Sequence, residues 1–180
     1  TQTRESRFFG RGRLVQDGGP YNFQTQFFDQ VVHAWRWTGD PELESLLRES
    51  LPLHMEWVQD CFDPDNDGLY ESYINTWPTD SVWFNGGGCA EETAYAFAGY
   101  LALAELARCA GDEATAKRHE TQAAKIRRSL LAELWIGRKG YVAQYKEQGG
   151  LRRVHEDSWL GAIFLPIETG VLDPARSAQA

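Results

Sequence analysis

Apolar side chains recur at helical spacing from the first quarter of the chain onward. Between residues 23 and 35 they fall three or four positions apart, which predicts an amphipathic helix. Gly39, Asp40 and Pro41 then follow in order. Glycine suits a helix C-terminus, aspartate caps an N-terminus, and proline fits the first helical position. The pattern therefore predicts a helix, a tight turn and a second helix whose leucine-lined face runs over residues 43–58.

The same order returns in the middle of the chain. Residues 90–110 are apolar on nearly every side, which is typical of a helix that other elements cover. Gly111 and Asp112 repeat the turn, and residues 113–135 carry one apolar line opposite a basic face. We therefore expect a covered helix followed by one that faces water.

The repeated Gly-Asp turns organise the chain into hairpins. Gly39 and Gly111 lie 72 positions apart (111 minus 39), which indicates a slow repeat of helical hairpins. A first helix that other elements cover and a second helix that faces water favour a closed double ring of inner and outer helices over an open solenoid. Six hairpins of this size would need roughly 430 residues. The chain would then hold two hairpins and part of a third.

The expected fold class is all-α, a partial α/α toroid. Residues 1–19 are polar and punctuated by glycine, which predicts an irregular lead-in. Residues 20–180 are expected to form one domain of about two and a half hairpins. Within that domain, residues 141–145 suit a brief strand, and residues 157–168 suit a last helix.

Composition and charge limit the classes of partner that the chain is expected to bind. It has 180 residues, 42% of them hydrophobic, a formal net charge of -8 and a pI of about 5.0. This length supports one substantial core. Nucleic acid is not expected as a partner, because no stripe of Lys and Arg is present. No apolar run is long enough to cross a bilayer, so we expect a soluble chain without membrane contact. Localisation stays open among periplasm, secretion and cytoplasm.

The connection between the two hairpins, residues 63–88, has the most informative composition. It contains five carboxylates, several large aromatic side chains and three consecutive glycines. Loops of this length are usually functional or disordered, and aromatic richness is not typical of disorder. The connection therefore predicts an ordered rim over a functional site.

Short motifs in this connection resemble the six-hairpin glycosidase superfamily, the α/α toroids that include glucoamylases, trehalases and glycogen-debranching glucosidases. Asp65-Asn-Asp-Gly-Leu-Tyr-Glu71 looks like the Asp-Gly-Asp-Gly-Leu-x-Glu loop that follows an outer helix in such enzymes. Thr79-Asp-Ser-Val-Trp-Phe84 is similar to the Thr-x-Asp-Ala-x-Leu-Trp-Phe motif of debranching-enzyme relatives, although the spacing between Thr79 and Asp80 is one residue shorter. His155-Glu-Asp-Ser-Trp159 lies where an inner helix would begin. The resemblance covers about residues 20–175.

The resemblance implies glycoside cleavage, which needs two carboxyl groups. One protonates the leaving oxygen, and the other activates water or attacks directly. In these toroids, acids in the loops before inner helices face the central cavity. The catalytic candidates that this implies are Asp80, Glu71, Asp157 and Glu156.

Asp80 is the first choice among these acids. Trp77 and Trp83 flank it and would raise its pKa by excluding water, although a cap or turn aspartate explains the position equally well. Glu91 and Glu92 also precede or open an inner helix. They are more readily explained as first-turn residues that the helix dipole favours.

Aromatic and polar side chains of the same connection suit a sugar site. Pyranose rings present apolar faces that stack on aromatic rings, while Asp and Asn accept hydrogen bonds from hydroxyl groups. The candidate substrate-binding residues are Trp77, Trp83, Tyr70, Tyr73, Asn75, Asn85 and Asp67.

No metal and no organic cofactor is assigned from the sequence, although one loop has partial calcium-loop spacing. Asp63, Asp65 and Asp67 copy the first half of such a loop, but its twelfth position is Ile74 rather than Glu. Glu71, at the ninth position, could partly substitute. Turns closed by aspartate side chains are the simpler explanation of this loop.

The sequence hypothesis is therefore part of a glycoside hydrolase that cleaves oligosaccharides by carboxylic acid catalysis. A second catalytic carboxylate and the rest of the toroid would come from elsewhere in the same gene product or from another chain. The alternative is a non-catalytic helical-repeat module that binds a protein partner. A toroidal cyclase or isomerase ranks last, because the sequence lacks the additional His or Cys chemistry that it would need.

Overall fold

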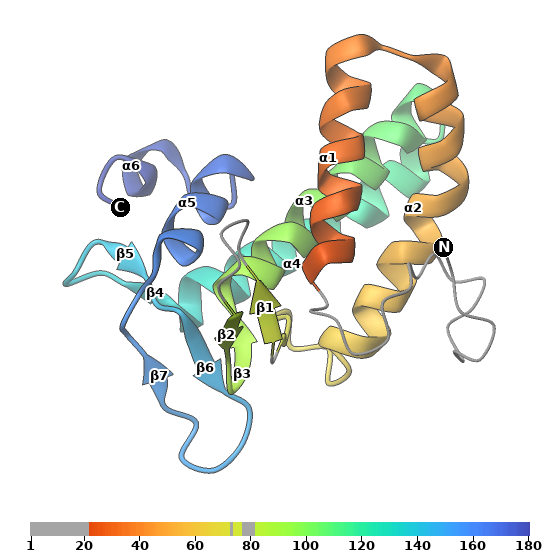
Figure 1. Cartoon of the computed structure of the whole chain (residues 1–180). Helices are drawn as coiled ribbons and strands as arrows, with labels where there is room; N and C mark the ends of the chain where they lie inside the picture. The colour runs from red at the N-terminus through yellow and green to blue at the C-terminus, as the bar shows by residue number, and fades with distance from the viewer. Residues whose placement is uncertain (1–21, 73, 77–81) are drawn as a thin grey trace.

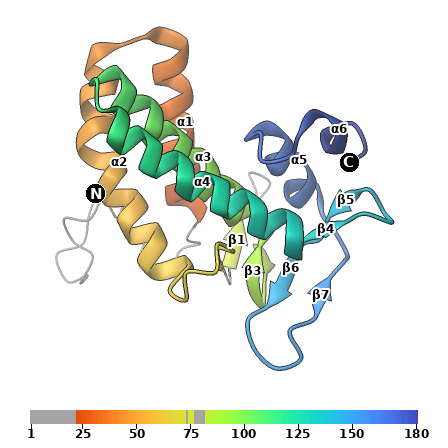
Figure 2. The same ribbon diagram turned by 180° about the vertical axis from the view of Figure 1, so that it is seen from behind.

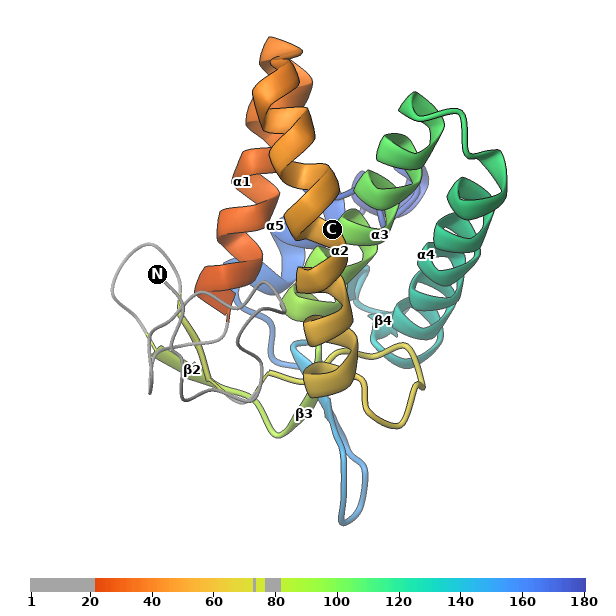
Figure 3. The same ribbon diagram turned by 90° about the vertical axis from the view of Figure 1, so that its right-hand side faces the viewer.

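Two long helical hairpins form most of the molecule. The computed structural model describes residues 22–72, 74–76 and 82–180. The first hairpin pairs α1 (Asn22–Thr38) with α2 (Pro41–Phe62), and the second pairs α3 (Ala90–Cys109) with α4 (Glu113–Glu133). Figure 3 shows the hairpins side by side, with their tips apart. The expected irregular lead-in over residues 1–19 lies outside the described residues.

The Gly-Asp turns close both hairpins as predicted. Gly39 and Gly111 have φ angles of 63° and 76°, in the left-handed region that glycine enters without strain. Asp40 then caps α2 by accepting a hydrogen bond from the Glu42 amide at 2.8 Å, and Asp112 caps α4 in the same way. Local sequence chemistry alone explains these two reversals.

Helix α3 lies at the centre of the arrangement, as Figure 1 shows. It contacts α1, α2, α4 and the shorter helix α5 (Leu160–Glu168). Its first eight residues are all buried, whereas α4 buries only four side chains along one line. Figure 2 shows α4 on the outside of α3. The predicted contrast between a covered helix and a water-facing helix is confirmed.

One core runs through both hairpins. Trp35 of α1 and Trp57 of α2 are buried in it, as their place in the helical stripes predicts. Phe28 of α1 stacks on His54 of α2 with ring centroids 4.1 Å apart. Burying a large apolar side chain contributes about 1.5–3 kcal/mol. Leu130 of α4 belongs to the same cluster, so the hairpins share their hydrophobic stabilisation.

Short antiparallel strands join the helices and correct the all-α expectation. The pairs are β1 (Ile74–Thr76) with β2 (Val82–Phe84), β6 (Tyr145–Glu147) with both β3 (Gly87–Cys89) and β7 (Val154–His155), and β4 (Trp135–Ile136) with β5 (Tyr141–Val142). The molecule is mostly helical with small sheets. Strands of two or three residues are too short to show an alternating pattern, which is why the sequence did not predict most of them.

Gly87 shows why the glycine run precedes α3. A Cβ at this position would lie 2.1 Å from the backbone oxygen of Lys146, so only glycine allows β3 and β6 to approach this closely. The glycines therefore serve strand pairing, and β3 leads directly into α3.

The C-terminal part differs from the sequence expectation at one boundary. Helix α5 begins at Leu160 rather than near residue 157, because His155 lies in β7 and Trp159, the N-cap residue, has an extended backbone. A short helix α6 (Pro174–Ser177) follows, and Asp173 caps it by accepting a hydrogen bond from the Arg176 amide. Among the described residues, the search for a helix long and apolar enough to cross a bilayer finds none.

Candidate active site

Two consecutive glutamates open α3 inside the molecule. Glu91 is 2% exposed and Glu92 is fully buried. The indole Nε1 of Trp159, just before α5, donates a hydrogen bond to Glu91. The Thr25 hydroxyl of α1 donates one to Glu92 Oε2 at 3.3 Å. The first turn of α3 is thus held between α1 and the segment that leads into α5.

Each of these carboxyl groups keeps one oxygen without a hydrogen-bond partner. Among the described residues, Glu91 Oε2 and Glu92 Oε1 are buried and accept no hydrogen bond. An unsatisfied buried polar group costs about 1–3 kcal/mol, and more when it is charged. Such groups are rare in native proteins and often belong to catalytic sites.

Burial favours the protonated form of both glutamates. It raises the pKa of Glu91 to about 7, against the lowering effect of hydrogen bonds that include the one from Trp159. Burial also raises the pKa of Glu92 to about 8, with the Thr25 hydroxyl opposing it and the Glu91 charge adding to it. The helix dipole favours a charged glutamate by about 0.3–1 kcal/mol. Glu91 and Glu92 lie in the first turn of α3, as expected, and desolvation outweighs the effect of the helix dipole on their pKa values there.

Further titratable groups of α1, α3 and α5 lie around this pair. Burial raises the pKa of Tyr95 on α3, and the charges of Asp29, Glu92 and Glu168 add to the effect. Burial also raises the pKa of Asp29, although His33 lies 3.7 Å from its carboxylate and opposes the shift. Three helices that are distant in sequence thereby direct acidic groups toward one region.

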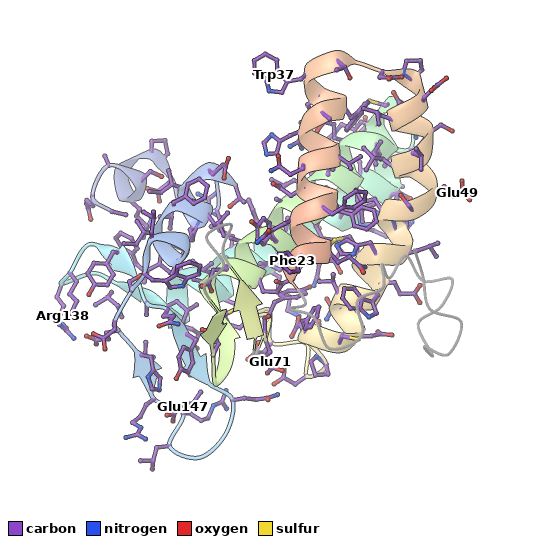
Figure 4. The ribbon with its side chains drawn as sticks, in the orientation of Figure 1. Phe23, Trp37, Glu49, Glu71, Arg138 and Glu147 are labelled. Carbon is purple, nitrogen blue, oxygen red and sulfur yellow. The ribbon has the colours of Figure 1, made fainter. Side chains whose placement is uncertain are left out.

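Glu71 lies elsewhere, beside the acidic turn that follows α2 (Figure 4). It shares a small hollow with Asp65, Asp67 and the basic side chains Lys146 and Arg152. Burial and the charges of the neighbouring aspartates raise the pKa of Glu71 to about 7. Asp67, expected to bind substrate, faces this hollow and accepts a hydrogen bond from the Leu69 amide at 2.7 Å.

Glu156 and Asp157 are not brought to the buried glutamates by any contact of the described residues. Glu156 pairs with Arg138 and with Lys139, the latter at 3.2 Å. These cations hold the pKa of Glu156 below its ordinary value. Arg138 points outward at the edge of the molecule in Figure 4, and Asp157 is exposed. An acid that protonates a leaving group needs the opposite environment.

Tyr70 and Asn85, expected to bind sugar, make contacts within the protein, and their role in sugar binding stays a prediction. Tyr70 is fully buried, and its hydroxyl donates to Gln59 Oε1 at 2.5 Å. Asn85 donates to the Ser72 carbonyl at 3.0 Å and accepts from Gln144 at 3.0 Å. Both ends of its amide are therefore used within the protein.

The other expected sugar contacts are only partly described. Asn75 and Trp83 are opposite each other in the register of β1 and β2. Tyr73, Trp77 and Asp80 lie outside the described residues, so their roles stay predictions.

Thr25 and Trp159 are contacts of the buried pair that sequence reasoning missed. Thr25 stands in no motif, and Trp159 closes the segment from His155 to Trp159 without a role of its own in the sequence prediction. Thr25 is 67 positions from Glu92, and Trp159 is 68 positions from Glu91. Only the packing of α1, α3 and the α5 segment reveals them.

One group of described residues has the geometry of a metal site. Asp63, Asp65 and Asp67 each offer a carboxylate oxygen, and these atoms lie within 4.8 Å of one another. All the donors are hard oxygens, which suit Ca²⁺ or Mg²⁺ rather than a transition metal.

Comparison with known proteins defines the class as a carbohydrate-active, glycoside hydrolase-like domain. The chain belongs to the family of the mannosylglycerate hydrolase MGH1-like glycoside hydrolase domain, whose model matches residues 86–180. The matched segment begins just before β3 and includes the buried glutamate pair. A search of curated proteins found no significant match.

Two solved structures share the fold. The GH78-family rhamnosidase of Bacillus sp. GL1 aligns with a TM-score of 0.70 and 16% sequence identity over 87% of this chain. A rhamnosidase from Klebsiella oxytoca, solved with rhamnose bound, aligns with a TM-score of 0.63 and 15% identity over 92% of this chain. The alignments cover 16% and 30% of those two chains, respectively. At 15–16% sequence identity, these alignments show a shared fold and nothing beyond it.

Proposed function

We propose that the chain supplies an acid catalyst to a glycoside hydrolase that cleaves oligosaccharides. The observation that carries the proposal is the buried pair Glu91 and Glu92 at the start of the central helix α3. Both have raised pKa values and an unpaired oxygen, and both lie in the segment that the glycoside hydrolase family model matches. A carboxyl group protonated near neutral pH is what leaving-group protonation requires.

In the proposed mechanism, Glu92 is the proton donor. Its proton passes to the glycosidic oxygen as the bond from the anomeric carbon to that oxygen breaks. Thr25 holds one Glu92 oxygen by its hydrogen bond, which leaves the other oxygen for the substrate. A second carboxylate activates water or attacks the anomeric carbon. Asp80 remains a candidate for that role, as does an acid supplied by a further hairpin.

The architecture that fits this proposal is the α/α toroid. Helices α1, α3 and α5 would form inner positions, since α3 contacts both of the others, and α2 and α4 would form outer positions. The start of α3 would then face the centre of the ring. The remaining hairpins of the ring would complete the substrate pocket.

The substrate we propose is a glycoside of a manno-configured sugar. The family description names a mannosylglycerate hydrolase, and the similar structures are rhamnosidases. Mannose and rhamnose share the manno arrangement of ring hydroxyl groups, with an axial hydroxyl at C2, although they belong to opposite D and L series, so both are tested separately. Mannosides and rhamnosides should therefore head any panel of test substrates.

The test is sugar release by the complete gene product that carries this chain. Glu92→Gln keeps the shape of the side chain and removes the acid, so kcat should fall by about 100-fold or more. Activity should partly return on substrates with a good leaving group, which need no protonation. Glu49→Gln, on the exposed face of α2, is the matched control and should retain wild-type rates.

Parallel variants separate the remaining assignments. Glu91→Gln tests the neighbour that Trp159 contacts, and Asp80→Asn tests the sequence-based first choice. Wild-type kcat in both Glu91→Gln and Glu92→Gln, with the fold intact by circular dichroism, would refute the acid assignment.

A further inference from the structure

Two chemically different hydrogen-bond donors hold the buried glutamate pair. The indole Nε1 of Trp159 donates to Glu91 Oε1, and the Thr25 hydroxyl donates to Glu92 Oε2 at 3.3 Å. An indole N–H can only donate, whereas a hydroxyl group can donate or accept. The contact on Glu91 therefore favours a charged carboxylate, while the contact on Glu92 suits the charged and the protonated form alike.

Further contacts of Glu91 act in the same direction as the indole. The Glu91 backbone amide and the Cys89 side chain of β3 also lower the pKa of Glu91, against the effect of burial. Among the described residues, the Thr25 hydroxyl is the group that lowers the pKa of Glu92. Because hydrogen bonds to a carboxylate stabilise its charged form, a negative charge is more stable on Glu91 than on Glu92.

The pair does not readily carry two negative charges. Both side chains are buried, so water screens their repulsion poorly, and the charge of Glu91 raises the pKa of Glu92. In the described part of the chain, no Lys, Arg or His forms an ion pair with either carboxyl group. Two carboxyl groups in such a place share one proton over a range of pH, as like charges at close quarters do in general.

Titratable groups on the neighbouring elements leave this order unchanged. Asp29 of α1 and Glu168 of α5 act on Tyr95 of α3, and burial raises the pKa of Tyr95, which keeps it neutral. Neither acid is among the charges that act on the two glutamates. On α2, burial lowers the pKa of His54 to about 3, so His54 is neutral as well. The order of ionisation within the pair therefore depends on its own hydrogen bonds.

The indole ring of Trp159 is fixed by its surroundings. A Cβ on Gly161 would lie 2.6 Å from Cη2 of Trp159, so the ring lies directly against the backbone of the first turn of α5. The ring also packs against the main core. Next to it, the Ser158 hydroxyl donates to the Val142 carbonyl at 2.8 Å and ties the segment to β5. The N–H group is therefore held in one direction, toward Glu91.

We propose that Trp159 is a positioning residue that fixes Glu91 as the carboxylate of the pair and thereby keeps the shared proton on Glu92. This inference rests on the proposed function, in which Glu92 is the proton donor. Glu91 supplies the neighbouring negative charge that delays the ionisation of Glu92. Trp159 acts through Glu91 and touches neither the substrate nor the proton that is transferred.

Trp159→Phe tests the proposal because it keeps an aromatic ring and removes the N–H donor. Glu91 should then hold its own proton more tightly, and Glu92 should ionise at lower pH because no neighbouring charge opposes it. Glu91→Gln should have the same effect. In the complete gene product, the alkaline limb of kcat follows the Glu92 pKa of about 8. We expect it to move to lower pH by about 0.5 or more in both variants.

Carboxyl carbon-13 NMR follows both titrations in the full chain without any turnover. Glutamate is labelled at Cδ, and the spectra of Glu91→Gln and Glu92→Gln assign the two signals. In the wild type, Glu91 should lose its proton at lower pH than Glu92. In Trp159→Phe the order should reverse or the two titrations should coincide. Trp37→Phe removes an indole that is 88% exposed on α1, so it is the matched control and should titrate as the wild type does.

An alkaline limb that stays in place in either Trp159→Phe or Glu91→Gln would overturn this inference. So would the wild-type order of ionisation in the NMR titration of Trp159→Phe. A lower Tm of Trp159→Phe with neither change would show a purely structural role. If Trp159→Phe does not fold, the limb of Glu91→Gln decides. Absence of sugar release by the wild type would instead remove the glycosidase function, and the NMR titrations would still test the place of the proton.

Discussion

At the residue scale, burial is the largest cause of the raised pKa of Glu92. The same glutamate at an exposed helix start would be a charged residue that the helix dipole stabilises. Here Thr25 from α1 and the surrounding core remove it from water, and its pKa rises to about 8. The raised pKa is thus a consequence of position rather than of residue type.

This shift predicts a specific pH dependence of stability. The folded pKa values of Glu91 and Glu92 are about 7 and about 8, against an ordinary value of 4.5. Between about pH 4.5 and pH 8 the folded protein retains protons that the unfolded chain has released. These two glutamates should therefore contribute a free energy of unfolding that falls as pH rises through this range. Burial lowers the pKa of His54 from 6.5 to about 3, so His54 contributes the opposite slope below about pH 6.5.

Glu92→Gln should remove a large part of that dependence. The amide cannot ionise, so between pH 5 and pH 8 its Tm should fall by several degrees less than that of the wild type, corresponding to roughly 2–4 kcal/mol. Thermal melts at both pH values measure the difference. Glu49→Gln serves as the control and should follow the wild type. Parallel wild-type and Glu92→Gln curves would contradict the raised pKa.

At the element scale, helices and turns follow from local sequence, whereas strands depend on partners. Gly39 and Gly111 end helices because they adopt left-handed backbone conformations. Gly87 has no such φ angle. Its need for glycine comes from the close approach of Lys146, which lies 59 residues later in the chain.

Gly87→Ala should consequently destabilise the protein by about 2 kcal/mol or more, because a methyl group 2.1 Å from the Lys146 oxygen forces β3 and β6 apart. Gly149→Ala is the matched control, since no atom lies within 4 Å of its added Cβ. Denaturant unfolding of both variants gives the comparison. Equal stability of the two would show that the strand contact tolerates a side chain.

At the scale of the whole molecule, one core joins the hairpins. Leu51 of α2, Leu130 of α4 and Val171 after α5 all belong to the same buried cluster. Shared burial couples these segments, so they should unfold together. This is the basis for retaining residues 20–180 as one domain, a prediction that no observation yet tests.

Truncation of the core at either hairpin should reveal this coupling. Leu51→Ala and Leu130→Ala should each cost about 2–5 kcal/mol and lower one common transition. Differential scanning calorimetry, with the calorimetric and van't Hoff enthalpies compared, measures the cooperativity. Two separate transitions, one for each hairpin, would show that the hairpins are independent units.

The sequence by itself determined the helices, their caps and the order of covered and water-facing elements, because those depend on residues within a few positions of one another. Local motifs also indicated the acidic loop and the glycosidase class. Tertiary structure decided the raised pKa values of Glu91 and Glu92, the contacts of Tyr70 and Asn85 within the protein, and the hollow that Glu71 shares with Asp65 and Asp67. Desolvation and hydrogen bonding depend on neighbours that only folding supplies, and no local pattern encodes them.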